Sequence, residues 1–591
     1  MITMTPLHSD QNAQSDQNAQ PSLNAQSQPT PPPPYPSTLP EPAPPQPNQG
    51  APLPPPPPST QAAFSQPSPS ARLMLPRPTL ADLLFALALV VLGFCFWEWR
   101  ILEYEGAGIG TTLFFLLAIV ATFFYLRAKG IKQNARSLLL LAVALAGVAP
   151  FVLYGFREQV NLIFLLFEGL FCLLWVAYSC RTIIAQRLSG FIMGDLFNQV
   201  FVVPLTNLSS FFTRPFAGVG TRRSLLLPVI FAVLGVVVCV PLFAIITALL
   251  VSSDDAFRSF TQELFERFAV EELVRYAFEL VFGIPIAVYI FGAVVGNVFR
   301  NHTAHLSHEE LGRAFSAAHI LPKAALYTPL VLLVALYVTY FITMANYLFS
   351  GLFSELPGTY TYAEYARSGF FELCGVASIN LGLLALIWLL ARRGGGEHPL
   401  PLRLLAGVLS LLTCLLIVTA ASKMLLYIES YGLTPLRVYT LWFMALMLLV
   451  FLLLVAWHIR PFNAARPIVV LVVVAVLALG LTNTNGLIAE HNVQRYLDGR
   501  ATQFTESPAR PDYTPEGIDV AFLLRLGDPA IPALYELKAK AQDEKVRLAA
   551  ADAIEAICNP ASSMDEWWPS QPGWPGWDLA SYRAARLYEG D

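Results

Sequence analysis

Apolar runs follow one another along the chain from about residue 80 to about residue 487. Each run is close to the roughly 20 residues that a helix needs to cross the hydrocarbon core of a bilayer. We count eleven of them, at 80–99, 106–126, 137–155, 160–180, 224–251, 276–299, 325–348, 370–391, 404–428, 438–458 and 467–487. Because lipid offers no partner for exposed backbone groups, the pattern predicts an all-α polytopic transmembrane bundle of about eleven spans over 80–487.

The chain before this bundle has the composition of a disordered segment. It contains the tandem hexapeptide "SDQNAQSDQNAQ" and the Pro-rich stretch "PTPPPPYPSTLPEPAPPQPNQGAPLPPPPPST", and neither has enough apolar residues for a core. We therefore predict a disordered tail over residues 1–76. The first apolar run starts too late for a signal peptide. The Pro runs favour polyproline II, which suits either a solvated spacer or a ligand of an aromatic-lined protein module.

The chain after the bundle, residues 488–591, is hydrophilic in character. Its stretch "LGDPAIPALYELKAKAQDEKVRLAAADAIEAI" predicts a helix from about residue 529 and a second helix begun by Asp543. The second helix has an apolar face made by Val546, Ala550, Ala553 and Ile557. The layout resembles one HEAT-type repeat, and a single repeat cannot stack into a solenoid. We expect its apolar face to pack on the membrane domain or on a protein partner.

The end of the chain, "WWPSQPGWPGWDLASYRAARLYEG", is rich in Trp. Trp suits the interface between a membrane and water, but these rings also suit packing under the tail's own helices. Both interpretations remain open.

Composition supports the membrane class. The chain has 591 residues, of which 55% are hydrophobic and 13% charged, with a mean hydropathy of +0.53. These values are typical of an integral membrane protein in a lipid bilayer rather than of a soluble domain. The net charge of −4 gives no reason to expect a nucleic-acid partner.

Lys and Arg gather in alternate loops between the runs. The richer loops contain Arg127, Lys129, Lys132, Arg136, Arg181, Arg187, Arg214, Arg222, Arg223, Arg300, Arg313, Lys323, Arg392, Arg393, Arg403, Arg460 and Arg466. Because cytoplasmic loops carry the excess of basic residues, we expect a cytoplasmic N-terminus in the cell membrane. An odd number of spans then places the C-terminal segment outside the cytoplasm, and one span more or fewer would reverse that side.

Catalytic and metal-binding signatures are missing from the sequence. It contains no P-loop, Rossmann glycine pattern, nucleophile elbow or His-Glu-x-x-His motif. The cluster His302, His305 and His308 is a conceivable metal site, but Ser307 and Glu310 form a capping box that marks a helix start instead. We expect no cofactor and no metal site.

Ionisable residues inside or at the ends of spans are the main functional candidates, since each is costly in hydrocarbon. Glu168 and Glu279 are intramembrane carboxylates, which suit protonated groups that hydrogen-bond to neighbouring helices. An outer polar cluster is predicted where several helix ends meet, from Glu364, Arg367, Glu372, Lys423, Glu429 and Arg437. This cluster suits the binding of a headgroup or solute, and equally a structural lattice of ion pairs.

Four segments carry a family resemblance: "YAEYARSGFFELCGVASINL", "LTPLRVYTLWFMALMLLVF", "HNVQRYLDG" and "WDLASYRAARL". They resemble bacterial multi-pass membrane proteins of domain-of-unknown-function family 4173, which is related to family 4153. The resemblance implies a bacterial cytoplasmic-membrane protein with an outer C-terminal segment. It supplies no established activity and therefore no catalytic residue.

Three classes of function remain. The first is a non-enzymatic sensor, binding or scaffold protein of the cell envelope, with partner-like elements at both ends of the chain. The second is a transporter or a handler of a lipid-linked substrate, in which Glu168, Glu279 and Lys423 line a polar route. The third is an intramembrane enzyme that uses Glu364 or Glu372 as an acid or base.

Overall fold

The computed structural model describes most of the chain after residue 78. The described residues are 79–103, 108–155, 160–183, 192–215, 270–300, 323–343, 370–390, 399–500, 517–559 and 574–590, with isolated positions at 235–253 and 345. All belong to the unit Met74–Asp591. They form helices, and no strand occurs among them, so the all-α prediction is confirmed. The predicted tail 1–76 and the His302, His305 and His308 cluster lie outside these ranges.

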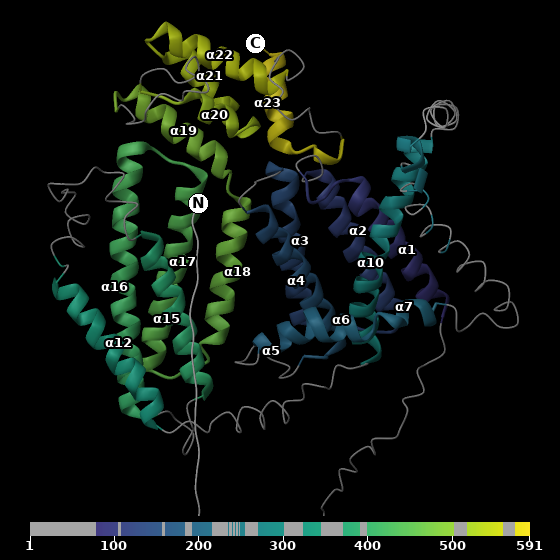
Figure 1. Ribbon diagram of the computed structural model, residues 1–591, viewed down its shortest axis with the longest axis horizontal. Helices are drawn as coiled ribbons and strands as arrows, with labels where there is room; N and C mark the ends of the chain where they lie inside the picture. Colours follow the sequence, from purple (N-terminus) through teal and green to yellow (C-terminus); the bar gives the residue numbers. More distant parts are fainter. Residues whose placement is uncertain are drawn as a thin grey trace, which may run out of the picture. The chain divides into compact units, whose positions relative to one another are not determined.

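A first group of helices packs around one apolar core (Figure 1). It consists of α1 (Leu80–Glu98), α2 (Ile109–Ala128), α3 (Ala135–Tyr154), α4 (Asn161–Cys180) and α10 (Val270–Phe299). Helices α1 and α10 cross very closely, because Gly93 and Gly283 face each other. A Cβ at Gly93 would lie 2.2 Å from the carbonyl oxygen of Gly283. Small residues of this kind allow helix backbones to approach within a membrane.

A second group of helices has its own core, which includes Leu409, Leu416 and Phe451. It consists of α12 (Lys323–Thr343), α15 (Phe370–Leu390), α16 (Leu400–Tyr431) and α17 (Pro435–Ile459). Helix α18 (Ala465–Leu481) contacts both α17 and α3, so it joins the two groups.

Eight helices of the described residues are long and apolar enough to cross a membrane, or nine if one bent pair counts as a span. The expected eleven spans are therefore not confirmed. The predicted run 224–251 lies largely outside the described residues, and α15, a helix of 21 residues, is counted only over its described part, Glu372–Ile387, which is shorter than a span.

The last predicted run, 467–487, does not form one straight helix. It breaks between α18 and α19 (Thr484–Leu497) with a bend of 63°. Thr482 is extended and the side chain of Asn483 accepts a hydrogen bond from the Gly486 backbone at 3.1 Å. The polar sequence "TNTN" thus ends one helix and caps the next.

Short helices occupy part of the loop after α4, where the sequence predicted only a basic connection. They are α5 (Ile192–Phe197), the π-helical turn η2 (Asn198–Val202), α6 (Val203–Thr206) and α7 (Ser209–Thr213). They pack against α4 and against the last part of α10.

The C-terminal unit comprises α19, α20 (Val520–Arg525), α21 (Ile531–Lys540), α22 (Glu544–Cys558) and α23 (Leu579–Glu589). The two predicted helices are α21 and α22, and the Asp543 side chain caps α22 by accepting from the Lys545 backbone at 2.9 Å. The predicted face of α22 is buried at Val546, Ala550, Ala553 and Ile557. Helix α22 packs mainly on α21 and α20, with Leu433 and Val438 of the second group at the edge of the same core.

Candidate functional site

The predicted outer polar cluster is described only in part, because Glu364 and Arg367 lie outside the described residues. Lys423 of α16 is 1% exposed, and Glu372 at the start of α15 is near enough to interact with it electrostatically. The structure therefore brings one acidic and one basic member of the predicted cluster together, in the second group.

The other two described members, Arg437 and Glu429, contact other parts of the chain. Arg437 donates hydrogen bonds to the carbonyl oxygens of Tyr431 at 3.0 Å and Gly432 at 2.6 Å. Its guanidinium group also lies 4.0 Å from the ring centre of Tyr427, so it holds the turn between α16 and α17. Glu429 is exposed and interacts electrostatically with Arg495 of α19. These two contacts are structural links between the second group and the C-terminal unit.

A buried hydrogen-bond chain crosses the second group. The Tyr337 hydroxyl donates to Asn380 Oδ1 at 2.8 Å, and Asn380 Nδ2 donates to Thr413 Oγ1 at 2.9 Å. The chain ties α12, α15 and α16 together, which is a common use of polar side chains in membrane helices. Among the described residues of the second group, Lys423 is the buried charged side chain.

The two intramembrane carboxylates lie in separate surroundings. Glu168 of α4 is 0% exposed; its Oε1 is 3.5 Å from Cys172 Sγ, and its Oε2 makes no hydrogen bond. Glu279 of α10 accepts from Arg275 at 3.0 Å, and Arg275 also donates to Glu98 at 2.7 Å. Both belong to the first group, whereas Lys423 belongs to the second. The described contacts therefore do not join the three residues into one polar route.

The sequence interpretation missed a buried ion pair at the basic end of the first group. Asp82, 0% exposed, accepts from Lys129 Nζ at 2.7 Å and from the Tyr125 hydroxyl at 2.6 Å. Asp82 also completes a capping box with Thr79 at the start of α1. The spacing Thr79 to Asp82 is the signal that could have identified this residue as a helix cap.

A second missed network surrounds the π-helical turn η2. Asn297 of α10 donates to Gln199 Oε1 at 2.7 Å and accepts a hydrogen bond from Thr182. Asn198 is buried and neither polar atom of its side chain has a hydrogen-bond partner. Sequence could not place these residues, because they lie in a loop that the apolar pattern leaves without structure.

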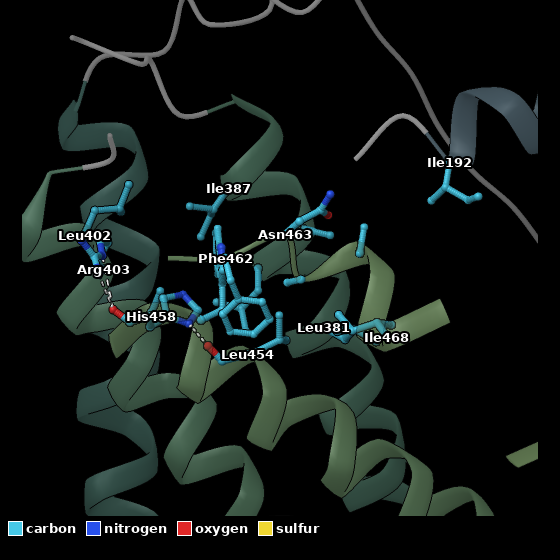
Figure 2. A pocket seen from close by; sticks show the side chains of 16 residues that line it. Ile192, Leu381, Ile387, Leu402, Arg403, Leu454, His458, Phe462, Asn463 and Ile468 are labelled. Carbon is cyan, nitrogen blue, oxygen red and sulfur yellow. Dashed lines mark hydrogen bonds between the residues drawn. The ribbon is translucent and has the colours of Figure 1, made fainter. Parts of the chain in front are cut away.

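An apolar cavity of about 470 Å³ lies between α15, α16, α17 and the start of α18 (Figure 2). Arg403, His458 and Asn463 supply polar groups in its wall. Arg403 donates to the His458 carbonyl at 2.9 and 3.2 Å and to the Ile459 carbonyl at 3.1 Å, which satisfies the end of α17.

The C-terminal unit is attached to both helix groups. Asn492 of α19 accepts from the Leu433 backbone at 2.8 Å and donates to its carbonyl at 2.9 Å. On the first group, the Ile109 backbone donates to the Trp577 carbonyl at 2.8 Å. The Trp574 ring meets Trp99 at the end of α1, with centroids 5.4 Å apart. Trp577 instead lies 6.2 Å from Tyr582 of α23, so this ring packs on the tail's own helix, whereas Trp574 packs on the first group.

Two carboxyl groups meet at this attachment. Ser581 Oγ lies 2.7 Å from Asp528 Oδ2 and 2.9 Å from Asp578 Oδ2. One hydroxyl has one proton to donate, so the second short contact requires a proton on one of the carboxyls. Burial raises the pKa of Asp578 to about 6 and also raises the pKa of Asp528. Asp578 rests against Gly155, where a Cβ would lie 2.4 Å from Oδ2.

Among the described residues, no three potential ligands of the His, Cys, Asp or Glu type gather at a metal-binding distance. An all-α chain with at least eight apolar helices of spanning length is a multi-pass integral membrane protein.

The chain belongs to the family called Domain of unknown function (DUF4153), whose profile matches residues 114–537. This match covers most of both helix groups and the C-terminal unit as far as α21. No curated protein matches the chain, and no solved structure does.

Proposed function

We propose that this protein is a non-enzymatic sensor, binding or scaffold protein of the bacterial cell envelope. In this proposal the N-terminus is cytoplasmic, the C-terminal unit faces outward, and that unit receives a protein partner. We also propose that the chain is related to the narrower family 4173. The Pro-rich N-terminal segment is a second element that suits a protein partner.

One observation carries the proposal: the C-terminal unit has its own core and is attached to an end of each helix group. A transporter of the rocking type moves one bundle against another around a site at the membrane centre. A folded unit bound to both bundles at one end opposes that movement. This attachment suits a scaffold that holds a protein partner. It also suits a sensor in which partner binding changes the conformation of both helix groups.

The distribution of charge supports the proposed orientation. The C-terminal unit contacts the N-terminal end of α2 at Ile109 and the turn between α16 and α17 at Leu433. The opposite ends of these helices carry Lys129, Arg403 and Arg460. Under the positive-inside rule, the basic ends are cytoplasmic and the C-terminal unit is outside.

Photo-crosslinking in intact bacteria tests the proposal. A photoreactive phenylalanine analogue replaces Tyr588, an exposed residue of α23, and a matched variant carries it at the exposed Phe124 of α2. We expect a discrete protein adduct from position 588, reduced when Asp578→Ala weakens the attachment, and no such adduct from position 124. Equal adducts at both positions, or none beyond lipid at 588, would contradict a partner on the C-terminal unit.

A transporter or handler of a lipid-linked substrate is the second candidate, and the buried Lys423 beside Glu372 favours it. Its test is solute flux in proteoliposomes. Flux that disappears with Lys423→Gln but survives Lys540→Gln, an exposed Lys of the C-terminal unit, would favour this candidate over the first.

A further inference from the structure

The cavity in the second group has a mixed wall (Figure 2). Its apolar part includes Leu384, Ile387, Ala406, Leu454, Trp457 and Phe462. Its polar part includes Arg403, His458 and Asn463, and no carboxylate occurs among the described residues that line it. A volume of about 470 Å³ lies within the range of about 300 to 1,000 Å³ that is usual for sites that hold small molecules or chains.

The cavity lies at the basic ends of its helices. Arg403, in the first turn of α16, lines it; Arg460, which follows α17, is two residues from a lining residue, and Arg466, in the first turn of α18, is next in sequence to one. We call these three Arg residues the cationic rim. Arg460 and Arg466 are exposed. The buried Asp195 of α5 is an acidic group on this side, since it and Arg466 both act electrostatically on Tyr178. Within the part of the chain that the structure describes, the three Arg side chains outnumber this acid and leave the rim positive.

The start of α18 adds to this positive potential. Asn463, Ala464 and Ala465 line the cavity, and the N-cap residue Ala464 provides no side-chain hydrogen bond to the first turn. The backbone N–H groups of a helix N-terminus attract negative charge. An apolar cavity beside a cationic rim therefore matches a molecule with a hydrocarbon chain and a negatively charged head.

We propose that this cavity binds an anionic phospholipid from the membrane leaflet at the basic helix ends. One acyl chain occupies the cavity between α15 and α17, and the phosphate group lies at the cationic rim. Charge complementarity selects a lipid with net negative charge over a zwitterionic one, because each basic residue near a membrane surface favours anionic lipid.

The test uses the full-length protein in nanodiscs of mixed phosphatidylcholine and phosphatidylglycerol, with native mass spectrometry of the lipid that stays bound after release. We expect phosphatidylglycerol to be retained in preference. Ala385→Phe fills the cavity from α15 and should abolish this retention. Ser378→Phe, two turns away on the same face of α15 and outside the cavity, should leave it unchanged.

A charge variant tests the contact with the lipid headgroup separately from the contact with the acyl chain. Arg460→Gln should weaken phosphatidylglycerol retention roughly fivefold, which corresponds to the loss of one basic residue near lipid. Arg127→Gln makes the same charge change at the same end of the first group and should have no effect.

Three results would overturn the proposal. They are equal retention of the two lipids, unchanged retention in Ala385→Phe, and displacement of phosphatidylglycerol by inorganic phosphate, which would indicate a site for the ion alone. If Ala385→Phe does not fold, Ala464→Phe fills the cavity from the opposite wall and is judged by the same readout.

Discussion

The two helix groups differ in how closely they pack. In the first group, a Cβ added at Gly93, Gly147 or Gly283 would lie within 2.5 Å of a neighbouring atom. In the second group, Gly375 and Gly382 of α15 have no neighbour within 4 Å, and a cavity of about 470 Å³ lies at the basic end. The first group also has an open glycine, Gly169, and a cavity of about 450 Å³, so the difference in packing is confined to its helix crossings. The two cavities differ in charge: Arg403 lines the one in the second group, whereas no charged residue occurs among the described residues that line the one in the first group.

The two groups also differ in one pair of buried charges. The first group pairs Asp82 with both Lys129 and Tyr125, although Glu168 of the same group keeps one oxygen without a hydrogen bond to the described residues. The second group buries Lys423 against Glu372, which is exposed. The comparison teaches that close helix crossings and a paired buried acid hold the first group together, and that the second group, with a cationic cavity wall, is the place to look for a charged ligand. Variants that alter the helix packing or the buried charge of one group test this comparison.

Asp82→Ala should have the largest effect. It leaves Lys129 and the Tyr125 hydroxyl without their partner, and breaking a buried ion pair costs about 3 to 5 kcal/mol of the free energy of unfolding. Reversible denaturation in mixed micelles, followed by circular dichroism, measures the change. Glu103→Ala removes an exposed ion pair with Arg100 and should cost no more than about 1 kcal/mol. Equal losses in the two variants would contradict a rigid first group.

Gly→Ala substitutions should separate the two groups directly. Gly93→Ala forces a methyl group against the Gly283 backbone and should destabilise the protein by about 1 to 3 kcal/mol. Gly382→Ala has open space and should stabilise α15 by about 0.5 to 1 kcal/mol, since Ala is the better helix former. The denaturation experiment in mixed micelles measures both changes. Effects of the same sign in both variants would contradict the difference in packing.

The attachment of the C-terminal unit should depend on pH with a defined sign. The pKa of Asp578 is about 6 when attached, against an ordinary value of 3.8, so the attached state binds the proton more tightly. Attachment should therefore strengthen by about 1 kcal/mol as the pH falls from 7 to 5.

Hydrogen exchange of the α23 amides, corrected for intrinsic rate, measures this pH dependence. Asp578→Asn should remove the part of the pH dependence that Asp578 contributes, because the amide does not titrate, and leave the part that the buried Asp528 carboxyl contributes. Protection that increases with rising pH would show that the carboxyl is not held as the structure describes.

Lys423→Met should have the smallest effect. Met keeps the length of the side chain in the α16 core, and the exposed Glu372 keeps access to water, so we expect a change below about 1 kcal/mol. If Lys423→Met lowered the free energy of unfolding as much as Asp82→Ala does, Lys423 would belong to a buried ion pair, and the two groups would be alike in this respect.

The sequence predicted the elements whose signal is local. The length of each apolar run predicts the length of α1 to α4. The N-cap Asp543 and the apolar face that includes Val546 predict α22. The bend at Thr482 was missed because a hydropathy window averages over the few polar residues that cap α19.

The candidate sites depended on contacts that no local pattern reveals. Asp82 and Lys129 are 47 residues apart, and Ser581 reaches Asp528 across 53 residues. The cavity is lined by parts of α15, α16, α17 and α18 and by Ile192 of α5, so none of them shows it alone. Sequence found ionisable residues such as Glu168 from their cost in lipid, but it could not tell which neighbours they face.

Cysteine labelling in right-side-out spheroplasts tests the central claim, an outward-facing C-terminal unit attached to both groups. In a background without the native cysteines, Leu548→Cys places a thiol on the exposed side of α22, and Arg136→Cys places one at the basic end of α3. A membrane-impermeant maleimide should label position 548 at once and position 136 only after permeabilisation. Labelling of position 136 first, with position 548 protected until permeabilisation, would contradict the proposed orientation and the function built on it.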